Sequence, residues 1–241
     1  RPQMLVLMKL SDDLTPKYRK LISLVGQLKA GRGLVMCGSI YEGDFSDPAV
    51  RDASKKIQTN LKSAMKEEKV KGFAKSVICN EVPEGINVLI QSIGVGALKP
   101  NTVVVGWPYT WREEMNNQTY YDFLDAIHRI ATADMCLLIP KGIDLFPERD
   151  QKVTGMIDVW WIMHDGGLLL LLPFLLKKHK VWRHCKIRVY AVATQNDNNI
   201  KMKECLNKWI YQLRIDAEVY VVEMPGTDVT AYIHEKTIQM E

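Results

Sequence analysis

The sequence predicts an α/β protein with largely parallel sheets flanked by helices. Short aliphatic runs alternate with longer helical patterns along most of the 241 residues. Strands that are joined by helices of about ten or more residues pair in parallel through right-handed crossovers. The composition, with 47% hydrophobic and 25% charged residues, is typical of a globular protein and argues against disordered, collagen-like and disulfide-scaffold classes.

The alternation is clearest in the first part of the chain. Runs typical of buried strands occupy residues 4–10, 33–40, 74–79, 102–105 and 135–139. Apolar residues at helical spacing predict helices over residues 16–28, 53–69, 85–93 and 120–133. In the second of these helices, Ile57, Leu61 and Met65 form one apolar line among charged residues, as in a surface helix that covers a sheet.

The pattern breaks in a stretch rich in Pro, Gly and charge, residues 140–155, and then begins again. We therefore expect a first subdomain over residues 1–150 and a second, smaller one over residues 151–241. In the second, we expect strands at 158–163, 186–193 and 217–223 and helices at 168–182 and 200–213. The tail, residues 227–241, fits either a last helix or the start of a longer segment.

The cysteines and the apolar stretches further narrow the class of protein to which the chain can belong. Five cysteines without CxxC spacing, four of them inside apolar runs, are interpreted as reduced core residues in a cytosolic setting. No spacing offers metal-ligand geometry, so no metal is expected. The most apolar stretch, residues 166–176, is far shorter than the roughly 20 residues of a membrane span. We expect no signal peptide and a soluble chain, although a fragment of a membrane protein would look the same.

Residues at the strand exits are the candidates for ligand binding, because open α/β sheets bind ligands outside the carboxyl ends of their strands. The residues taken as these exits are Lys9 for the first expected strand, Gly38-Ser39-Ile40 for the second, and Gly106-Trp107 for the fourth. Lys9 and Lys17 could meet phosphate oxygens, and Trp107 or Tyr41 could pack against a base. This set suits a mononucleotide. The alternative, in which the glycines only form tight turns, stays open.

The sequence offers no catalytic set, and we do not expect an enzyme. It contains neither a GxxxxGK[ST] loop nor a dinucleotide fingerprint, and His164-Asp165 without a GxSxG elbow is interpreted as a turn. The basic stretch 177–186 could bind acidic lipid heads, phosphates or RNA, or could complement the dipole of a helix C-terminus. Trp160-Trp161 is interpreted as core plus a dimer contact.

Several long strings point to a known family: RPQMLVLMKL, LKAGRGLVMCGSI, VLIQSIGVGALKPNTVVVGWP, IDVWWIMHDGGLLLLLPFLLKKHKVWRHCKIRV and LRIDAEVYVVEM. Over nearly the whole chain they resemble the cytosolic C-terminal domain of the cation-chloride cotransporters, in the potassium-chloride branch. The resemblance implies two packed α/β subdomains similar to universal stress proteins. It also implies a regulatory and dimerising domain at the cytoplasmic face of the plasma membrane, attached to an electroneutral K-Cl symporter.

The resemblance further implies ATP or ADP bound without hydrolysis in a cleft of the first subdomain. Carried onto this chain, it assigns Lys9 and Lys17 to the phosphates, Ser39 and Ile40 to adenine or ribose through backbone groups, and Gly106 with Trp107 to the lining of the cleft. The implied partners are the protein's own transmembrane domain, a homodimer partner, and regulatory kinases and phosphatases, with no nucleic acid. The alternative is a purely structural dimerisation scaffold without a functional nucleotide site.

Overall fold

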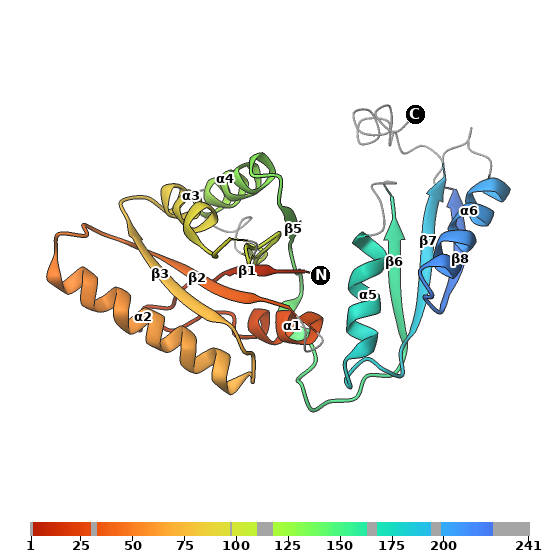
Figure 1. The fold of residues 1–241 in the computed structure, drawn as a ribbon, viewed down its shortest axis with the longest axis horizontal. Coiled ribbons are helices and arrows are strands. Elements are labelled where there is room, and N and C mark those ends of the chain that lie inside the picture. Colours follow the sequence, from red (N-terminus) through yellow and green to blue (C-terminus); the bar gives the residue numbers. More distant parts are fainter. Residues whose placement is uncertain are drawn as a thin grey trace. The chain divides into compact units, whose positions relative to one another are not determined.

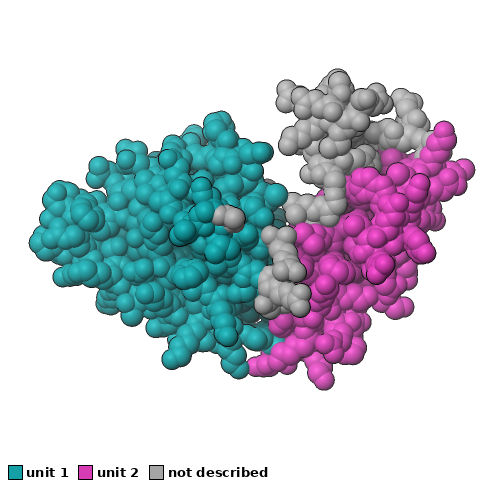
Figure 2. Space-filling model, viewed as in Figure 1, with its two compact units in different colours: residues 1–149 teal, residues 150–241 magenta. Residues whose placement is uncertain are grey.

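The computed structural model describes residues 2–29, 33–96, 98–109, 118–162, 168–193 and 199–223. The chain forms two compact units, residues 1–149 and residues 150–241, which Figure 2 colours separately. The sequence interpretations of residues 164–167 and 227–241 lie outside the described residues.

The first unit is built on a parallel five-stranded sheet with the order β3-β2-β1-β4-β5. Its elements in chain order are β1 (Met4–Leu7), α1 (Lys20–Lys29), β2 (Val35–Glu42), α2 (Pro48–Glu67), β3 (Phe73–Cys79), α3 (Val82–Ser92), β4 (Thr102–Val105), α4 (Gln118–Thr132), β5 (Cys136–Leu138) and the short 3-10 helix η1 (Ile143–Leu145). The parallel pairing confirms the α/β fold class predicted from the sequence.

Helices cover both faces of this sheet, with α1 and α2 on one face and α3 and α4 on the other (Figure 1). Leu5 and Val6 of the central strand β1 point to opposite faces and have no exposed surface. Parallel strands buried on both faces are continuous apolar runs, which is why β1 lacks a polar alternation. The long helix α2 starts at Pro48 because the Asp47 carboxylate accepts a hydrogen bond of 2.8 Å from the backbone N–H of Ala49.

The second unit contains a parallel sheet with the order β6-β7-β8. Its elements are β6 (Met156–Trp161), α5 (Leu168–Lys178), β7 (Lys186–Ala193), α6 (Asn199–Gln212) and β8 (Ala217–Glu223). Leu170 of α5 and Leu206 of α6 belong to one core cluster that also contains Val159 and Trp161 of β6. Both helices therefore cover the same face of the sheet.

Two boundaries differ from the sequence prediction for physical reasons. Helix α1 begins at Lys20 rather than at residue 16, because Pro16 bridges to Leu10 in a hairpin that precedes the helix. Strand β2 continues to Glu42, two residues beyond its expected end, because it stays paired with β3 as far as Cys79.

The interpretation of the cysteines as core residues is wrong for two of the five. Cys37 and Cys185 are buried and Cys79 is half-buried, whereas Cys136 and Cys205 are exposed. All five are free thiols. Burial raises the pKa of the Cys37 thiol to about 12.

Thiol labelling of the native chain should therefore distinguish the exposed cysteines from the buried ones. The thiolate is the reactive species, and a pKa raised from 9.0 to about 12 lowers the thiolate fraction of Cys37 by roughly a thousandfold below pH 9. We expect maleimide at pH 7.5 to modify Cys136 and Cys205 within minutes and Cys37 only after denaturation. Peptide mass spectrometry measures this, and rapid labelling of Cys37 in the native chain would contradict it.

Candidate functional site

The strand order of the first unit reverses between β1 and β4. The chain passes from β1 to β2 and β3 on one side, and then returns to pair β4 with the other side of β1. The register aligns Leu7 of β1 with Val105 of β4, so the residues that follow these two strands leave the sheet at the same level. We call these residues the switch point. Open α/β sheets bind their ligands at such a position.

A hairpin after β1 brings two of the predicted lysines together. The backbone N–H of Lys17 donates to the carbonyl of Lys9 at 2.9 Å. At the tip of the hairpin, the Asp13 carboxylate accepts hydrogen bonds from the hydroxyl and from the backbone N–H of Thr15, which lower the pKa of Asp13. Asn60 of α2 holds the tip by donating to the carbonyl of Leu14 at 2.9 Å. The hairpin is therefore fixed to the fold at its tip.

The segment after β4 lies against the start of α1. A Cβ added at Gly106 would lie 3.5 Å from Leu21 Cδ1 and 4.0 Å from Tyr18 Cδ2, which are ordinary contacts. The rings of Tyr18 and Tyr109 have centroids 6.3 Å apart, and the Lys17 ammonium lies 5.8 Å from the Tyr18 ring. The structure thus brings Lys9, Lys17 and Gly106 to one edge of the sheet.

Trp107 is the fourth predicted residue at this edge, and it already has neighbours. The Lys141 ammonium lies 4.9 Å from the centre of the indole, and Phe123 packs against it edge to face at 6.0 Å. A cation over an aromatic face contributes about 0.5–1 kcal/mol at an exposed site. A base that stacks on the face occupied by Lys141 would have to displace that ammonium.

Lys141 is a cation beside the switch point that was not predicted from the sequence. It follows β5 by three residues, in a stretch interpreted only as a domain boundary. The rule applied to the exits of β1, β2 and β4 would also have selected it, because β5 is parallel to them. The signal in the sequence was therefore a lysine that closely follows an expected strand.

The segment after β5 is tied to the same edge by main-chain contacts. The Tyr109 hydroxyl accepts hydrogen bonds from the backbone N–H groups of Gly142 (2.7 Å) and Ile143 (3.1 Å). Lys20, the first residue of α1, donates to the carbonyls of Asp144 (2.8 Å) and Phe146 (3.1 Å). Three segments that are distant in sequence are thus held together around the start of α1.

The other two predicted residues lie inside β2 and not after it, which corrects their expected position. Ser39 is 2% exposed, and its hydroxyl donates to the carbonyl of Met8 at 2.9 Å. Ile40 packs against α3, where a Cβ at Gly85 would come within 2.5 Å of Ile40 Cγ2. Both side chains are engaged within the fold, so only main-chain groups of these residues remain for a role in binding.

Gly38 has a packing role rather than the turn role that the sequence left open. It lies within β2, and a Cβ there would meet Leu89 of α3 at 3.1 Å and Leu5 of β1 at 3.2 Å. Contacts this short require the neighbours to move. Glycine at this position allows α3 to approach the sheet closely.

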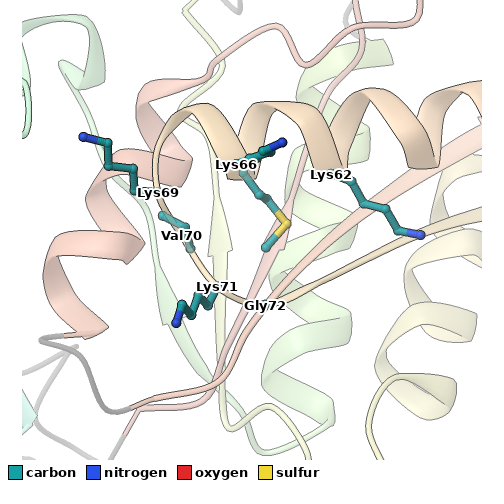
Figure 3. A pocket seen from close by; sticks show the side chains of 7 residues that line it. Lys62, Lys66, Lys69, Val70, Lys71 and Gly72 are labelled. Atoms are coloured by element: carbon teal, nitrogen blue, oxygen red, sulfur yellow. The ribbon is translucent and has the colours of Figure 1, made fainter.

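Two surface hollows lie away from the switch point. One, of about 510 Å³, is lined by residues at and after the end of α2, namely Lys62, Met65, Lys66, Lys69, Val70, Lys71 and Gly72. Figure 3 shows the ammonium ends of Lys62, Lys69 and Lys71 pointing away from one another, so these lysines do not converge on one anion. The other, of about 470 Å³, is lined by residues of α3 and α4.

The described residues contain neither a metal-binding cluster nor a membrane-spanning helix. Among them, no group of three or more His, Cys, Asp or Glu side chains lies close enough to hold a metal ion. No helix in the described part of the chain is long and apolar enough to cross a membrane.

Among solved structures, the fold is similar to that of universal stress proteins. A universal stress protein from Archaeoglobus fulgidus DSM 4304 matches with a TM-score of 0.54 at 12% identity, covering 95% of this chain and 79% of its own. A second protein from Archaeoglobus fulgidus matches with a TM-score of 0.41 at 12% identity, covering 58% of this chain and 99% of its own. Another, in complex with dAMP, has a TM-score of 0.39 at 11% identity, covering 58% and 98%.

The sequence itself identifies the family. The profile of solute carrier family 12 matches residues 19–153 and residues 140–240, which together span most of the chain. The chain therefore belongs to solute carrier family 12 and is a domain of a cation-chloride cotransporter.

Alanine substitution at Gly38, inside β2, and at Gly106, after β4, should show which of the two glycines is required for packing. Neither Gly38 nor Gly106 has a positive φ, so both backbones accept alanine. We expect Gly38→Ala to destabilise the first unit by about 1–3 kcal/mol through overpacking against Leu89 and Leu5. Gly106→Ala should change the stability by less than about 0.5 kcal/mol. Urea denaturation measures both, and equal stability of the two variants would contradict the packing role of Gly38.

Proposed function

We propose that this chain is the regulatory and dimerisation domain of a potassium-chloride cotransporter, and that ATP or ADP binds without hydrolysis at the switch point of its first unit. The family membership supports a transporter domain. The observation that carries the nucleotide proposal is the convergence of three loops near the reversal of strand order. Two of them carry cations, Lys9 and Lys17 after β1 and Lys141 after β5, and the third carries Trp107 after β4.

Each residue has a defined role in this proposal. Lys9 and Lys17 bind phosphate oxygens near the start of α1, whose first turn carries no acidic residue and so favours an anion. Trp107 packs against the base, and Gly106 lets the ligand approach the main chain. Ser39 and Ile40 contribute only through backbone groups. Hydrolysis is not proposed, because the sequence has no phosphate-binding GxxxxGK[ST] loop.

The nucleotide would act as a ligand that stabilises one arrangement of the transporter. A ligand shifts an equilibrium between two arrangements only by its difference in affinity for them. The proposal therefore requires that the switch point differ between a more active and a less active state. The partners in this account are the protein's own membrane domain, a second copy of the chain, and the kinases and phosphatases that regulate the transporter from the cytoplasmic face of the plasma membrane.

A second candidate function is a dimerisation scaffold without a functional nucleotide site. The contact between Lys141 and Trp107 favours it, because the indole already has a cationic neighbour. The engaged hydroxyl of Ser39 favours it as well. The two candidates differ in one measurable property, which is affinity for nucleotide at the switch point.

Isothermal titration of the purified chain with ATP and with ADP tests the proposal. We expect saturable binding with a dissociation constant between about 1 μM and 1 mM, a range equivalent to about 4–8 kcal/mol. Lys9→Ala removes a charge-assisted hydrogen bond and should weaken binding about tenfold or more. Trp107→Ala should weaken it by a similar factor, because base stacking on an aromatic ring contributes about 1–3 kcal/mol.

Matched variants distant from the switch point make the test specific. Lys62→Ala removes a lysine that lines the hollow at the end of α2. Tyr211→Ala removes an aromatic side chain of the second unit that is 84% exposed. Both should bind nucleotide like the wild type. The absence of heat and of a thermal shift at several millimolar nucleotide would leave only the scaffold. Equal losses in the control variants would show non-specific charge binding.

A further inference from the structure

The end of α2 carries a cluster of lysines that are exposed to solvent. The buried residues of the helix are Ile57, Leu61, Ala64 and Met65. Lys62 and Lys66 lie four residues apart, and therefore on one side of the helix, outside these buried positions. Lys69 and Lys71 follow the last turn and are also exposed. These four residues line the hollow described above, and we call them the lysine cluster.

The net charge of the chain is concentrated around this cluster. Residues 53–72 contain six lysines and two glutamates, so their net charge is +4. The whole chain has the same net charge of +4, and the charges of its other residues therefore balance. The fold adds Lys29, whose ammonium donates to the carbonyl of Lys71 at 2.6 Å. Burial of Lys29 and the charge of Lys71 lower the pKa of Lys29, as expected where cations are crowded.

The acidic side chains of α2 do not neutralise the lysine cluster, because each has another partner. Asp52 and Glu67 are the acidic residues of this helix. The Asp52 carboxylate pairs with Lys55 at 2.9 Å, and the Glu67 carboxylate pairs with Arg19 at 2.6 Å. Among the described residues, none forms a hydrogen bond or an ion pair with the ammonium groups of the cluster. Four positive charges therefore lie together without a negative partner in this part of the chain.

The cluster is also not needed to complete the end of the helix. A helix C-terminus attracts cations because its last carbonyl groups lack intrahelical partners. At the end of α2, the carbonyls of Met65 and Lys66 accept hydrogen bonds from main-chain N–H groups. Arg149 donates to the carbonyls of Glu68 (3.1 Å) and Lys69 (3.2 Å). Since other groups satisfy these carbonyls, the ammonium groups of the cluster are available to an external ligand.

The geometry of the cluster favours a ligand whose negative charges are spread over a surface. The ammonium ends of Lys62, Lys69 and Lys71 point away from one another (Figure 3). Tight binding of a single phosphate requires donors that converge on it, whereas diverging ammonium groups can each meet a separate anion. The exposed residues between the lysines of α2 are Thr59 and Ser63, which offer no apolar anchor for a bound peptide. The surface therefore attracts by charge rather than by shape.

An anionic membrane has this distribution of charge, and a cotransporter domain works beside a bilayer. The cytoplasmic leaflet is negatively charged, and each lysine near its surface raises membrane binding about fivefold. We propose that the lysine cluster binds the anionic phospholipid headgroups of the membrane that contains the transporter. This inference uses the cytoplasmic location in the proposed function, but it does not depend on nucleotide binding.

Sedimentation of the full chain with sucrose-loaded vesicles tests the proposal. One set of vesicles contains phosphatidylcholine and phosphatidylserine at about 3:1, and the other contains phosphatidylcholine alone. We expect the wild type to bind the mixed vesicles and to remain in solution with phosphatidylcholine. Raising the salt concentration from about 0.1 M to about 1 M should release the bound chain, because the Debye length falls from about 10 Å to about 3 Å.

Matched double variants test whether the lysine cluster carries the binding. Lys62→Gln with Lys66→Gln should lower the partition onto mixed vesicles about tenfold or more. Lys203→Gln with Lys208→Gln removes the same charge from exposed positions of α6 and should bind like the wild type. Lys62→Arg with Lys66→Arg keeps the charge and should also bind like the wild type. Thermal unfolding should be unchanged in every variant, because all four positions are exposed.

Three results would overturn the proposal. The first is a wild type that does not bind mixed vesicles. The second is an equal loss of binding in the two glutamine variants, since net charge rather than the lysine cluster would then control it. The third is binding to immobilised poly-glutamate without binding to mixed vesicles, which would indicate an acidic protein partner. None of these results changes the titration with ATP, so failure of this proposal is distinguishable from failure of the nucleotide site.

Discussion

The pairing of β1 on both sides is the constraint on which the rest of the first unit depends. This strand has only four residues, yet β2 and β4 pair with its two edges over the same residues. Its central position makes the chain cross from one face of the sheet to the other between β3 and β4. It therefore determines that α3 and α4 lie opposite α1 and α2, and that the loops after β1 and β4 meet.

The meeting of these loops also connects the switch point to the segment that leaves the first unit. Lys141 contacts Trp107, Tyr109 binds the start of η1, and Lys20 binds the two carbonyls that follow. A ligand that displaced Lys141 from the indole would disturb the first of these contacts. Residues 139–149 then lead directly into the second unit. Under the proposed function, a nucleotide at the switch point would therefore act on the contacts that hold residues 141–146 to the first unit.

The sequence correctly predicts the ends of those strands that are delimited by their own residues and the turns beside them. The apolar runs of β7 and β8 have the bounds predicted for them, because β-branched residues between polar turns delimit a strand. Lys9 and Trp107 fall at strand exits for the same reason. The end of β2 could not be predicted, since pairing with β3 extends it past the end of β1. The exposure of Cys136 also depends on position, because β5 is an edge strand.

Photolabelling with 8-azido-ATP, followed by peptide mapping, tests the central claim most directly, because it locates the base on the chain. The account predicts adducts in the hairpin of residues 8–19 or in residues 105–109, and their loss when unmodified ATP competes. The residues that line the hollow at the end of α2 should carry no adduct, since the ammonium groups of their lysines do not converge on one anion. Adducts confined to residues 62–72, or labelling that ATP does not reduce, would contradict a nucleotide site at the switch point.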